Sequence, residues 1–260
     1  GFTFGAAAVS GDVAIRNPIF DAVDPPIGVV VPEAHAYRCK FCVGDCNLGC
    51  AQAIENVIQR EGPETIAAFM MEPMAKGAIM PHPDYWSTIR NICDKYGILI
   101  IADEAVTGFG RSGTMFGVDH FGLEPDFMLF GKTLASGYQP VGATVTTTEI
   151  ADKFIGEGNQ LVMAHTLGGH PAGTAAALAS INIIERDNLV ERSRKMGDYL
   201  YTQLQTLMEH PIVGEVRGVG LLAAVDLVKD KKTKEPLGDS KGDDTATSQS
   251  NIGRKMTRFM

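Results

Sequence analysis

The sequence predicts an α/β protein whose mostly parallel sheet is covered by helices on both faces, giving three layers. Two observations carry this prediction: strand-like and helix-like segments alternate along the chain, and the strand-like segments are apolar without interruption, as buried parallel strands are. The composition agrees, since 45% hydrophobic and 21% charged residues over 260 positions are typical of a chain that buries a sizeable core.

The individual elements are predicted from their periodicity and from the residues that bound them. An apolar run between two prolines predicts the first strand, and Gly97 is typical of the residue that ends a helix. The segment 229–250 is polar and predicts an exposed loop. In chain order, the expected strands and helices occupy Thr65–Met71, Asp84–Tyr96, Gly97–Asp103, Asp126–Phe130, Val141–Thr147, Pro171–Glu185, Asn188–Glu209 and, for a final pair of strands, Val213–Val228.

The charge balance bears on partners and on location. With 23 Lys and Arg against 31 Asp and Glu, the formal net charge is −8, which argues against nucleic acid or an anionic membrane as the main partner. Residues 158–184 carry no Asp, Glu, Lys or Arg, but Gly168-Gly-His-Pro171 interrupts any apolar span there. No basic segment precedes an apolar one near the start. We therefore expect a cytoplasmic protein that binds neither nucleic acid nor membrane.

The segment Gly108-Phe-Gly-Arg-Ser-Gly113 matches the G-x-G-x-x-G pattern of dinucleotide-binding turns. That pattern binds a pyrophosphate only where the first glycine ends a strand and the last opens a helix. Here the strand ends near Asp103, and Thr114–Gly117 does not predict a helix. Asp126 has the spacing of a ribose-binding carboxylate but begins a strand. The sequence therefore does not favour a nucleotide site.

Four of the five cysteines lie within twelve residues, with His35 just upstream: Cys39, Cys42, Cys46 and Cys50. Four thiols are able to hold zinc or an iron–sulfur cluster, but the spacing is not the common one for either. A disulfide framework needs an oxidising compartment. Cys46 and Cys50 also have the spacing of a helix that continues through Val57. We expect no metal site, and these four cysteines are the candidate ligands if one exists.

The strongest chemical signal is a carboxylate and an amine at the ends of two strands. Asp103-Glu104 closes the clearest strand, and Lys132 follows the strand Asp126–Phe130. Carboxyl ends of neighbouring parallel strands face one crevice, so both groups enter the same pocket. Pyridoxal phosphate catalysis needs both, because a lysine forms the Schiff base and a carboxylate keeps the pyridine nitrogen protonated. A salt bridge at the strand ends is the alternative, and the spacing alone does not separate the two.

Longer segments around these residues resemble the class III pyridoxal-phosphate aminotransferases, which include the ω-amino acid, acetylornithine and 4-aminobutyrate aminotransferases. The segments that carry the resemblance are Met71-Glu-Pro73, Ile101-Ala-Asp-Glu-Ala-Val-Thr-Gly-Phe-Gly-Arg-Ser-Gly113, Pro125-Asp126, Phe130-Gly-Lys-Thr-Leu-Ala-Ser-Gly137 and Pro140-Val-Gly-Ala143. In this family the glycine segment is a turn that leaves the cofactor strand.

The resemblance runs from Gly1 to about Val228 and implies a fold type I architecture. It divides the chain into a cofactor-binding large domain, residues 1–185, and a linking helix with the start of a small α+β domain, residues 186–260. It also implies that segments of the family's large and small domains lie beyond both ends of this chain.

The resemblance further implies roles at matching positions. Lys132 matches the lysine that forms the internal aldimine with pyridoxal 5′-phosphate and moves the substrate proton, and Asp103 matches the partner of the pyridine nitrogen. Thr166 matches a threonine that reaches the phosphate of a neighbouring subunit's cofactor, which implies a homodimer with the site at the interface. Glu72 matches a pocket glutamate that supports Asp103.

Several positions depart from the family pattern. Ala105 stands where a valine usually packs on the cofactor ring, and Val106 where a glutamine near the phenolic oxygen is frequent. Met163, Ala164 and Leu167 replace His, Gly and Tyr. Arg111, after a glycine turn, is expected to cap a loop through several carbonyls.

The implied activity is transamination, in which an amino group passes from an amino acid or amine to a 2-oxo acid. A same-family aminomutase or decarboxylase uses the same lysine and aspartate and stays open as an alternative. Two hypotheses of other classes are a metal-binding or interaction module on Cys39–Cys50 and a catalytically inactive fragment.

Overall fold

The computed structural model describes residues 4–11, 28–42, 46–75, 77–162 and 165–237. A four-stranded sheet forms its centre, in the order β1 (Ala68–Met71), β2 (Leu99–Asp103), β3 (Phe127–Phe130) and β4 (Ala143–Thr146). The first three strands are parallel and β4 is antiparallel to β3. The predicted mostly parallel sheet is therefore confirmed, and the expected strands are present with shorter bounds.

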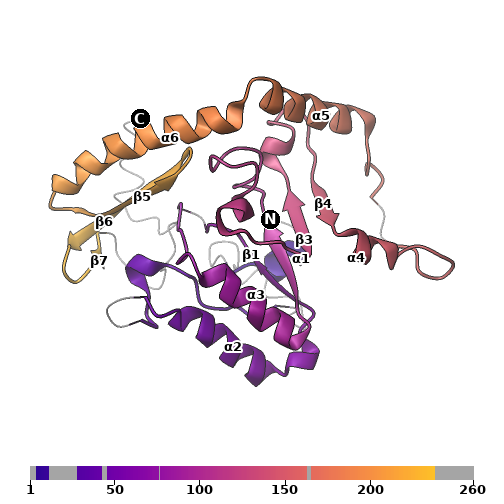
Figure 1. Ribbon diagram of the computed structural model, residues 1–260, viewed down its shortest axis with the longest axis horizontal. Helices are drawn as coiled ribbons and strands as arrows, with labels where there is room; N and C mark the ends of the chain where they lie inside the picture. The colour runs from indigo at the N-terminus through magenta and orange to yellow at the C-terminus, as the bar shows by residue number, and fades with distance from the viewer. Residues whose placement is uncertain (1–3, 12–27, 43–45, 76, 163–164, 238–260) are drawn as a thin grey trace.

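Helices pack against this sheet, with α2 (Gly49–Glu61) and α3 (Tyr85–Tyr96) side by side and α5 (Pro171–Arg186) across the top of the view (Figure 1). On one face lie α2 and α3, whose buried residues include Trp86 and Ile89. Burying a side chain such as Ile89 stabilises the fold by about 1.5–3 kcal/mol. Helix α5 packs through Ala177 and Ile184 in a second cluster that includes Phe130 of β3. The predicted α/β class is thus confirmed.

Local chemistry explains where these helices begin and end. Gly97 follows α3 with φ of 67°, and its N–H bonds to the carbonyls of Cys93 and Asp94, as expected for a left-handed helix end. Pro171 opens α5, where a missing N–H costs nothing, and His170 Nδ1 accepts the N–H of Ala172 at 3.2 Å.

The C-terminal part forms a second unit. The helix α6 (Leu189–Gln205) continues as a 3₁₀ turn over Thr206–Glu209 and leads into an antiparallel sheet of β5 (Val213–Val219), β6 (Leu222–Asp230) and β7 (Glu235–Pro236). Residues 229–236 therefore form a hairpin and not the predicted loop, although 229–235 are exposed as predicted, and 238–250 lie outside the described residues. The domain division at residue 186 stays a prediction.

Two arginines join the second sheet to the rest of the molecule. Arg38 ends a short 3₁₀ helix (Ala36–Arg38), and its guanidinium bonds to Asp226 of β6 at 2.7 Å. Arg217 of β5 donates to the carbonyl of Gly77 at 2.7 Å and also pairs with Glu215 and Asp226. These contacts fix the orientation of β5 and β6 against the segments around β1.

The remaining helices are short. They are α1 (Phe4–Ala8), α4 (Thr148–Asp152) and 3₁₀ turns at Pro63–Thr65, Gly117–Phe121 and Lys132–Leu134. Within the described residues, no helix combines the length and apolar character that crossing a bilayer requires.

Candidate cofactor and active site

Three neighbouring strands end at the same edge of the central sheet. Because β1, β2 and β3 are parallel, with Met71 beside Ala102 and Asp103 beside Leu129, the residues just beyond their carboxyl ends share this edge. Those residues are Glu72, the pair Asp103-Glu104, and Lys132. Open parallel sheets bind ligands at the carboxyl ends of their strands. We call this the carboxyl edge.

Asp103 is the last residue of β2 and is half-buried. Its Oδ1 accepts the backbone N–H of Ala105 at 3.0 Å, which holds the carboxylate against the turn that follows. Its second oxygen has no hydrogen-bond partner among the described residues. One acceptor atom of Asp103 is therefore available to a ligand at this edge.

Glu104 has the opposite environment, with 1% of its surface exposed. Its two oxygens accept the backbone N–H groups of Gly117 and Val118 at 2.9 Å each, and Thr107 donates its hydroxyl to the same carboxylate. Burial raises the pKa of Glu104 above its ordinary value, although these three hydrogen bonds oppose the shift. Glu104 thus ties the loop 105–118 to the end of β2. Local sequence patterns do not predict this role of Glu104.

Lys132 follows β3 after Gly131 and begins a short 3₁₀ turn, Lys132–Leu134. Its φ of 43° lies in the left-handed region, which costs a non-glycine residue about 1–2 kcal/mol. The side chain is exposed and makes no hydrogen bond or ion pair with a described residue. Strained backbone of this kind is frequent at functional sites, where surrounding contacts maintain it.

Helix α5 supplies contacts that maintain this turn. The hydroxyl of Ser180, buried on α5, donates to the carbonyl of Thr133 at 3.2 Å and lies 2.9 Å from the hydroxyl of Ser136. One helical residue therefore contacts both the turn and the segment that follows it. Because 47 residues separate Ser180 from Thr133, local sequence patterns do not predict this contact.

Three aromatic rings lie beneath the same turn. Phe130, two residues before Lys132, has its ring centroid 5.0 Å from that of Phe109 and 5.3 Å from that of Phe116. The Phe109 and Phe116 rings are edge-to-face at 5.8 Å. Such pairs contribute about 0.5–1.5 kcal/mol beyond their buried area. They connect the end of β3 to the loop that Glu104 anchors.

The glycine segment 108–113 packs against the C-terminal helix. Gly110 and Gly113 both have φ of 87°, and a Cβ on Gly113 would lie 3.2 Å from Cα of Arg194. No helix opens directly after Gly113, in agreement with the prediction that this is not a nucleotide-binding turn. The expectation for Arg111 is wrong in detail: its side chain is exposed and bonds to no described residue. Its carbonyl instead accepts from Leu221 N–H at 3.0 Å.

The other predicted site residues occupy two places. Ala105 and Val106 are half-buried in the turn after β2, and Glu72, also half-buried, follows β1. Thr166 is exposed in the turn before α5, and no contact in the described part of the chain links it to Asp103 or Lys132. Met163 and Ala164 lie outside the described residues.

The four clustered cysteines lie away from these residues, around the start of α2. Cys50 is buried within that helix, while Cys39, Cys42 and Cys46 are partly exposed and precede it. The helix begins at Gly49, so the predicted helical start at Cys46 is wrong. Leu48, the residue directly before the helix, has φ of 60°. This left-handed conformation marks the end of the irregular segment.

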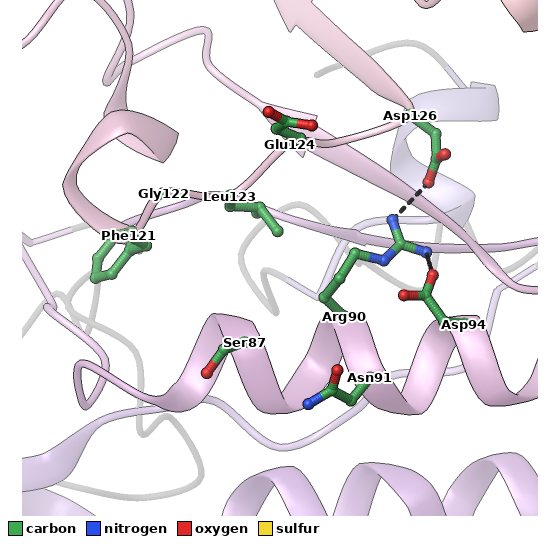
Figure 2. Close-up of a pocket in the computed structure, with 9 residues that line it drawn as sticks. All are labelled: Ser87, Arg90, Asn91, Asp94, Phe121, Gly122, Leu123, Glu124 and Asp126. Atoms are coloured by element: carbon green, nitrogen blue, oxygen red, sulfur yellow. Dashed lines mark hydrogen bonds and ion pairs between the residues drawn. The ribbon is translucent and has the colours of Figure 1, made fainter.

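Asp126 lies at the opposite, amino end of β3. Its Oδ2 accepts the N–H of Ile100 at 2.7 Å and pairs with Arg90 at 2.8 Å, and Arg90 also pairs with Asp94 at 2.6 Å (Figure 2). These residues line a cavity of about 440 Å³ between α3 and the segment 121–126. Asp126 is thus part of a structural ion pair with Arg90 at the amino end of β3.

The fold places the chain among enzymes of fold type I, because solved structures with this architecture are transaminases. The ω-transaminase of Pseudomonas jessenii in complex with PMP matches with a TM-score of 0.82 and 40% identity, covering 91% of this chain and 53% of that chain. An aminotransferase of Bacillus anthracis matches with a TM-score of 0.84 and 37% identity, covering 92% and 54%.

The family is defined by sequence. The aminotransferase class-III model matches residues 1–260, and the chain belongs to this family. A taurine–pyruvate aminotransferase of Bilophila wadsworthia is 45% identical over 219 residues, 80% of this chain and 48% of the relative. A putrescine–pyruvate aminotransferase of Pseudomonas aeruginosa is 43% identical over 192 residues, 73% and 42%. The chain spans about half the length of the curated relatives it matches.

Class III aminotransferases depend on pyridoxal phosphate, and the carboxyl edge fits that group. The cofactor requires an amine that is not already paired and a carboxylate with a free acceptor atom. Among the described residues, Lys132 and Asp103 meet these two requirements, at the ends of adjacent strands. The neighbouring Glu104 is buried and fully hydrogen-bonded, so it does not compete for the cofactor.

Proposed function

We propose that this chain is the cofactor-binding part of a pyridoxal-phosphate-dependent transaminase, which transfers an amino group from an amino acid or amine to a 2-oxo acid. The observation that carries the proposal is the pair Asp103 and Lys132 at the ends of adjacent parallel strands, each with a polar atom that bonds to no described residue. The names of the relatives support it, because taurine and putrescine are amines and pyruvate is a 2-oxo acid.

In this proposal, Lys132 Nζ would hold the cofactor covalently, and Asp103 would keep its pyridine nitrogen protonated. The cofactor, when bound, would supply an electron sink for the bonds at the substrate's amine-bearing carbon. Lys132 Nζ would also act as the base that removes the proton from that carbon and as the acid that returns a proton. The strained turn at Lys132 and its bonds to Ser180 keep this amine beside Asp103's strand.

The other assigned residues have supporting roles in the proposal. Ala105 and Val106, in the turn after Asp103, line the cofactor's surroundings with small apolar side chains. Glu72, at the end of β1, supports Asp103 from the third strand of the carboxyl edge. Because alanine is smaller than valine, Ala105 leaves the ring face less closely packed.

Thr166 supports a homodimer with the site at the subunit interface. It is exposed, it has no described contact with the carboxyl edge, and apolar side chains near it are open to solvent, namely Leu161, Val162 and Leu167, with 68%, 97% and 74% exposed. A monomer that leaves so much apolar surface in water is unusual. Light scattering of the purified protein tests this: a dimer is expected, and a monomer at micromolar concentration would contradict it.

The two-domain division at residue 186 and a cytoplasmic location belong to the same proposal. The first is supported by the two separate sheets, which lie on either side of that residue. The net charge of −8 supports a protein whose partners are small molecules and not nucleic acid.

The reaction is tested by offering amine donors, including taurine, putrescine and alanine, with pyruvate or 2-oxoglutarate as acceptor. We expect amine-dependent conversion of one acceptor to its amino acid. An aminomutase or decarboxylase uses the same lysine and aspartate but consumes no 2-oxo acid. Turnover of the amine without any acceptor would therefore favour those alternatives and contradict transamination.

A further inference from the structure

The segment that follows β1 starts at the carboxyl edge and leads into α3. It runs from Glu72 to Asp84, the residue directly before that helix. Met71, the last residue of β1, pairs with Ala102 of β2, so the next residues along these two parallel strands are Glu72 and Asp103. The position of Glu72 at the carboxyl edge therefore depends on the contacts that hold the chain on either side of it.

Trp86, in the first turn of α3, holds the chain directly after Glu72. Its indole N–H donates to the carbonyl of Pro73 at 3.0 Å, and both residues are fully buried. Proline has no N–H, so this carbonyl is the single backbone hydrogen-bonding group of Pro73. Among the described residues, the indole of Trp86 is its hydrogen-bond partner. Because an unpaired buried carbonyl is unfavourable, this bond fixes where Pro73 lies relative to α3.

Tyr85 holds the chain directly before Glu72. Its side chain is fully buried, and its hydroxyl donates to the sulfur of Met71 at 3.4 Å. Burial raises the pKa of Tyr85, so the hydroxyl keeps its proton and stays a donor. A thioether sulfur is a weak acceptor, so this contact is weaker than the indole bond. Two successive residues of one helix thus contact the neighbours of Glu72 on both sides.

Ring contacts fix the orientation of the indole. The Trp86 and Tyr85 rings pack edge-to-face, with centroids 5.6 Å apart and an interplanar angle of 80°. Trp86 also packs edge-to-face on Phe69 of β1, with centroids 6.3 Å apart. The indole is therefore held against the strand while its N–H bonds to the carbonyl of Pro73, which lies just beyond the strand's end.

Other contacts hold the rest of the segment. Ala75 and Ile79 exchange two backbone hydrogen bonds of 3.1 Å each, and Arg217 of β5 donates to the carbonyl of Gly77 at 2.7 Å. These contacts are independent of α3. Loss of the indole bond should therefore loosen residues 72–74 without unfolding the segment beyond them.

We propose that Trp86, assisted by Tyr85, is a positioning residue for transamination, because it fixes Glu72 beside Asp103 at the carboxyl edge. This role rests on the proposed function, in which Glu72 supports Asp103 and Asp103 keeps the pyridine nitrogen of the cofactor protonated. Trp86 contacts neither cofactor nor substrate in this proposal and acts through Glu72. When the indole N–H is removed, residues 72–74 shift and the support of Asp103 weakens.

Three single variants of α3 test this role in the complete protein loaded with pyridoxal phosphate. Trp86→Phe and Tyr85→Phe each keep an aromatic ring and remove one of the two donors. Tyr96→Phe is the matched control, because it removes a hydroxyl of the same helix that bonds to Glu55 of α2 at 2.9 Å. We expect kcat to fall about three- to tenfold for Trp86→Phe, since one hydrogen bond carries an effect of this size. It should fall less for Tyr85→Phe and stay unchanged for Tyr96→Phe.

A double-mutant cycle with Glu72→Gln separates positioning from general stabilisation of the fold. The second readout is the pH midpoint of the absorption band of the bound cofactor, which a purely structural change does not move. Glu72→Gln and Trp86→Phe should each shift this midpoint in the same direction. Together they should shift it no further than Glu72→Gln alone, because the indole acts through the glutamate. Tyr96→Phe should leave the midpoint where it is.

Additive midpoint shifts in the double variant, or equal losses of kcat in the Trp86 and Tyr96 variants, would overturn the positioning role and leave the proposed function standing. If Trp86→Phe does not fold, Tyr85→Phe in the Glu72→Gln background carries the same cycle, with a smaller expected shift. An unchanged protein with neither a cofactor band nor transamination would contradict the proposed function itself, and the positioning role with it.

Discussion

The two ends of the central sheet use aspartate in opposite ways. At the amino end, Oδ2 of Asp126 accepts the N–H of Ile100 and pairs with the guanidinium of Arg90. At the carboxyl end, the side chain of Asp103 has a single described hydrogen bond, from the N–H of Ala105, and the side chain of Lys132 has none. A carboxylate in an ion pair stabilises the fold, whereas a carboxylate with no cationic partner among the described residues keeps its binding capacity for a ligand. On the neighbouring strands β2 and β3, Asp126 thus has a structural role, and Asp103 is a candidate ligand of the cofactor.

The largest effect is expected from Lys132. Replacing it with alanine should abolish transamination and the absorption band of the protein-bound cofactor, because no other described group at the carboxyl edge offers an amine. Lys153→Ala, which removes an exposed lysine after α4, is the control and should change neither readout. Retention of the band in the Lys132 variant would contradict the assignment.

Replacing the two aspartates should change different properties, namely kcat for Asp103 and stability for Asp126. Asp103→Asn should lower kcat by about 10²–10³-fold, since electrostatic contributions of this type are worth about 3–4 kcal/mol. Asp126→Asn keeps an acceptor for Ile100 but loses the ion pair with Arg90, so it should cost about 1–3 kcal/mol of stability while kcat stays within a few-fold. Steady-state kinetics and urea unfolding of both variants measure the contrast. Equal losses of kcat in the two variants would contradict the different roles of the two aspartates.

Glu104 is expected to affect stability and its pH dependence. Gln in its place offers one acceptor oxygen to three donors, so Glu104→Gln should destabilise the protein by about 1–3 kcal/mol. Burial raises the folded-state pKa of Glu104 above its ordinary 4.5. Its favourable contribution is therefore complete below 4.5 and is lost as the pH rises through the raised value. Denaturation across this window should show a fall that the variant lacks; an identical slope in both proteins argues against the burial effect.

The smallest effect is expected at Ser180. Its replacement by alanine removes the hydrogen bonds to Thr133 and Ser136 that hold the Lys132 turn. We expect a loss of about 1 kcal/mol in stability and a few-fold loss in kcat. Thr174→Ala is a control on the same helix, because its hydroxyl bonds only to local carbonyls of His170 and Pro171. If Ser180→Ala loses no more stability or kcat than Thr174→Ala, the hydrogen bonds of Ser180 are not needed to hold the turn.

The sequence predicts which residues lie at the carboxyl edge, but it does not predict the contacts that hold them in place. Parallel strands put their carboxyl ends together, so Asp103 and Lys132 were placed at one edge from local patterns alone. The left-handed turn at Lys132, the burial of Glu104 and the contact from Ser180 depend on residues far apart in the chain. Local periodicity carries no information about such partners. The same limit explains the wrong helix start at Cys46, where Leu48 reverses the backbone.

The central claim is that Lys132 holds the cofactor at the carboxyl edge. Its most direct test loads the protein with pyridoxal phosphate, reduces it with borohydride and maps the modified peptide by mass spectrometry. The account predicts one cofactor per chain, attached to Lys132, with Asp103→Asn retaining the attachment. Attachment at another lysine, or none above that of the Lys132→Ala variant, would contradict it.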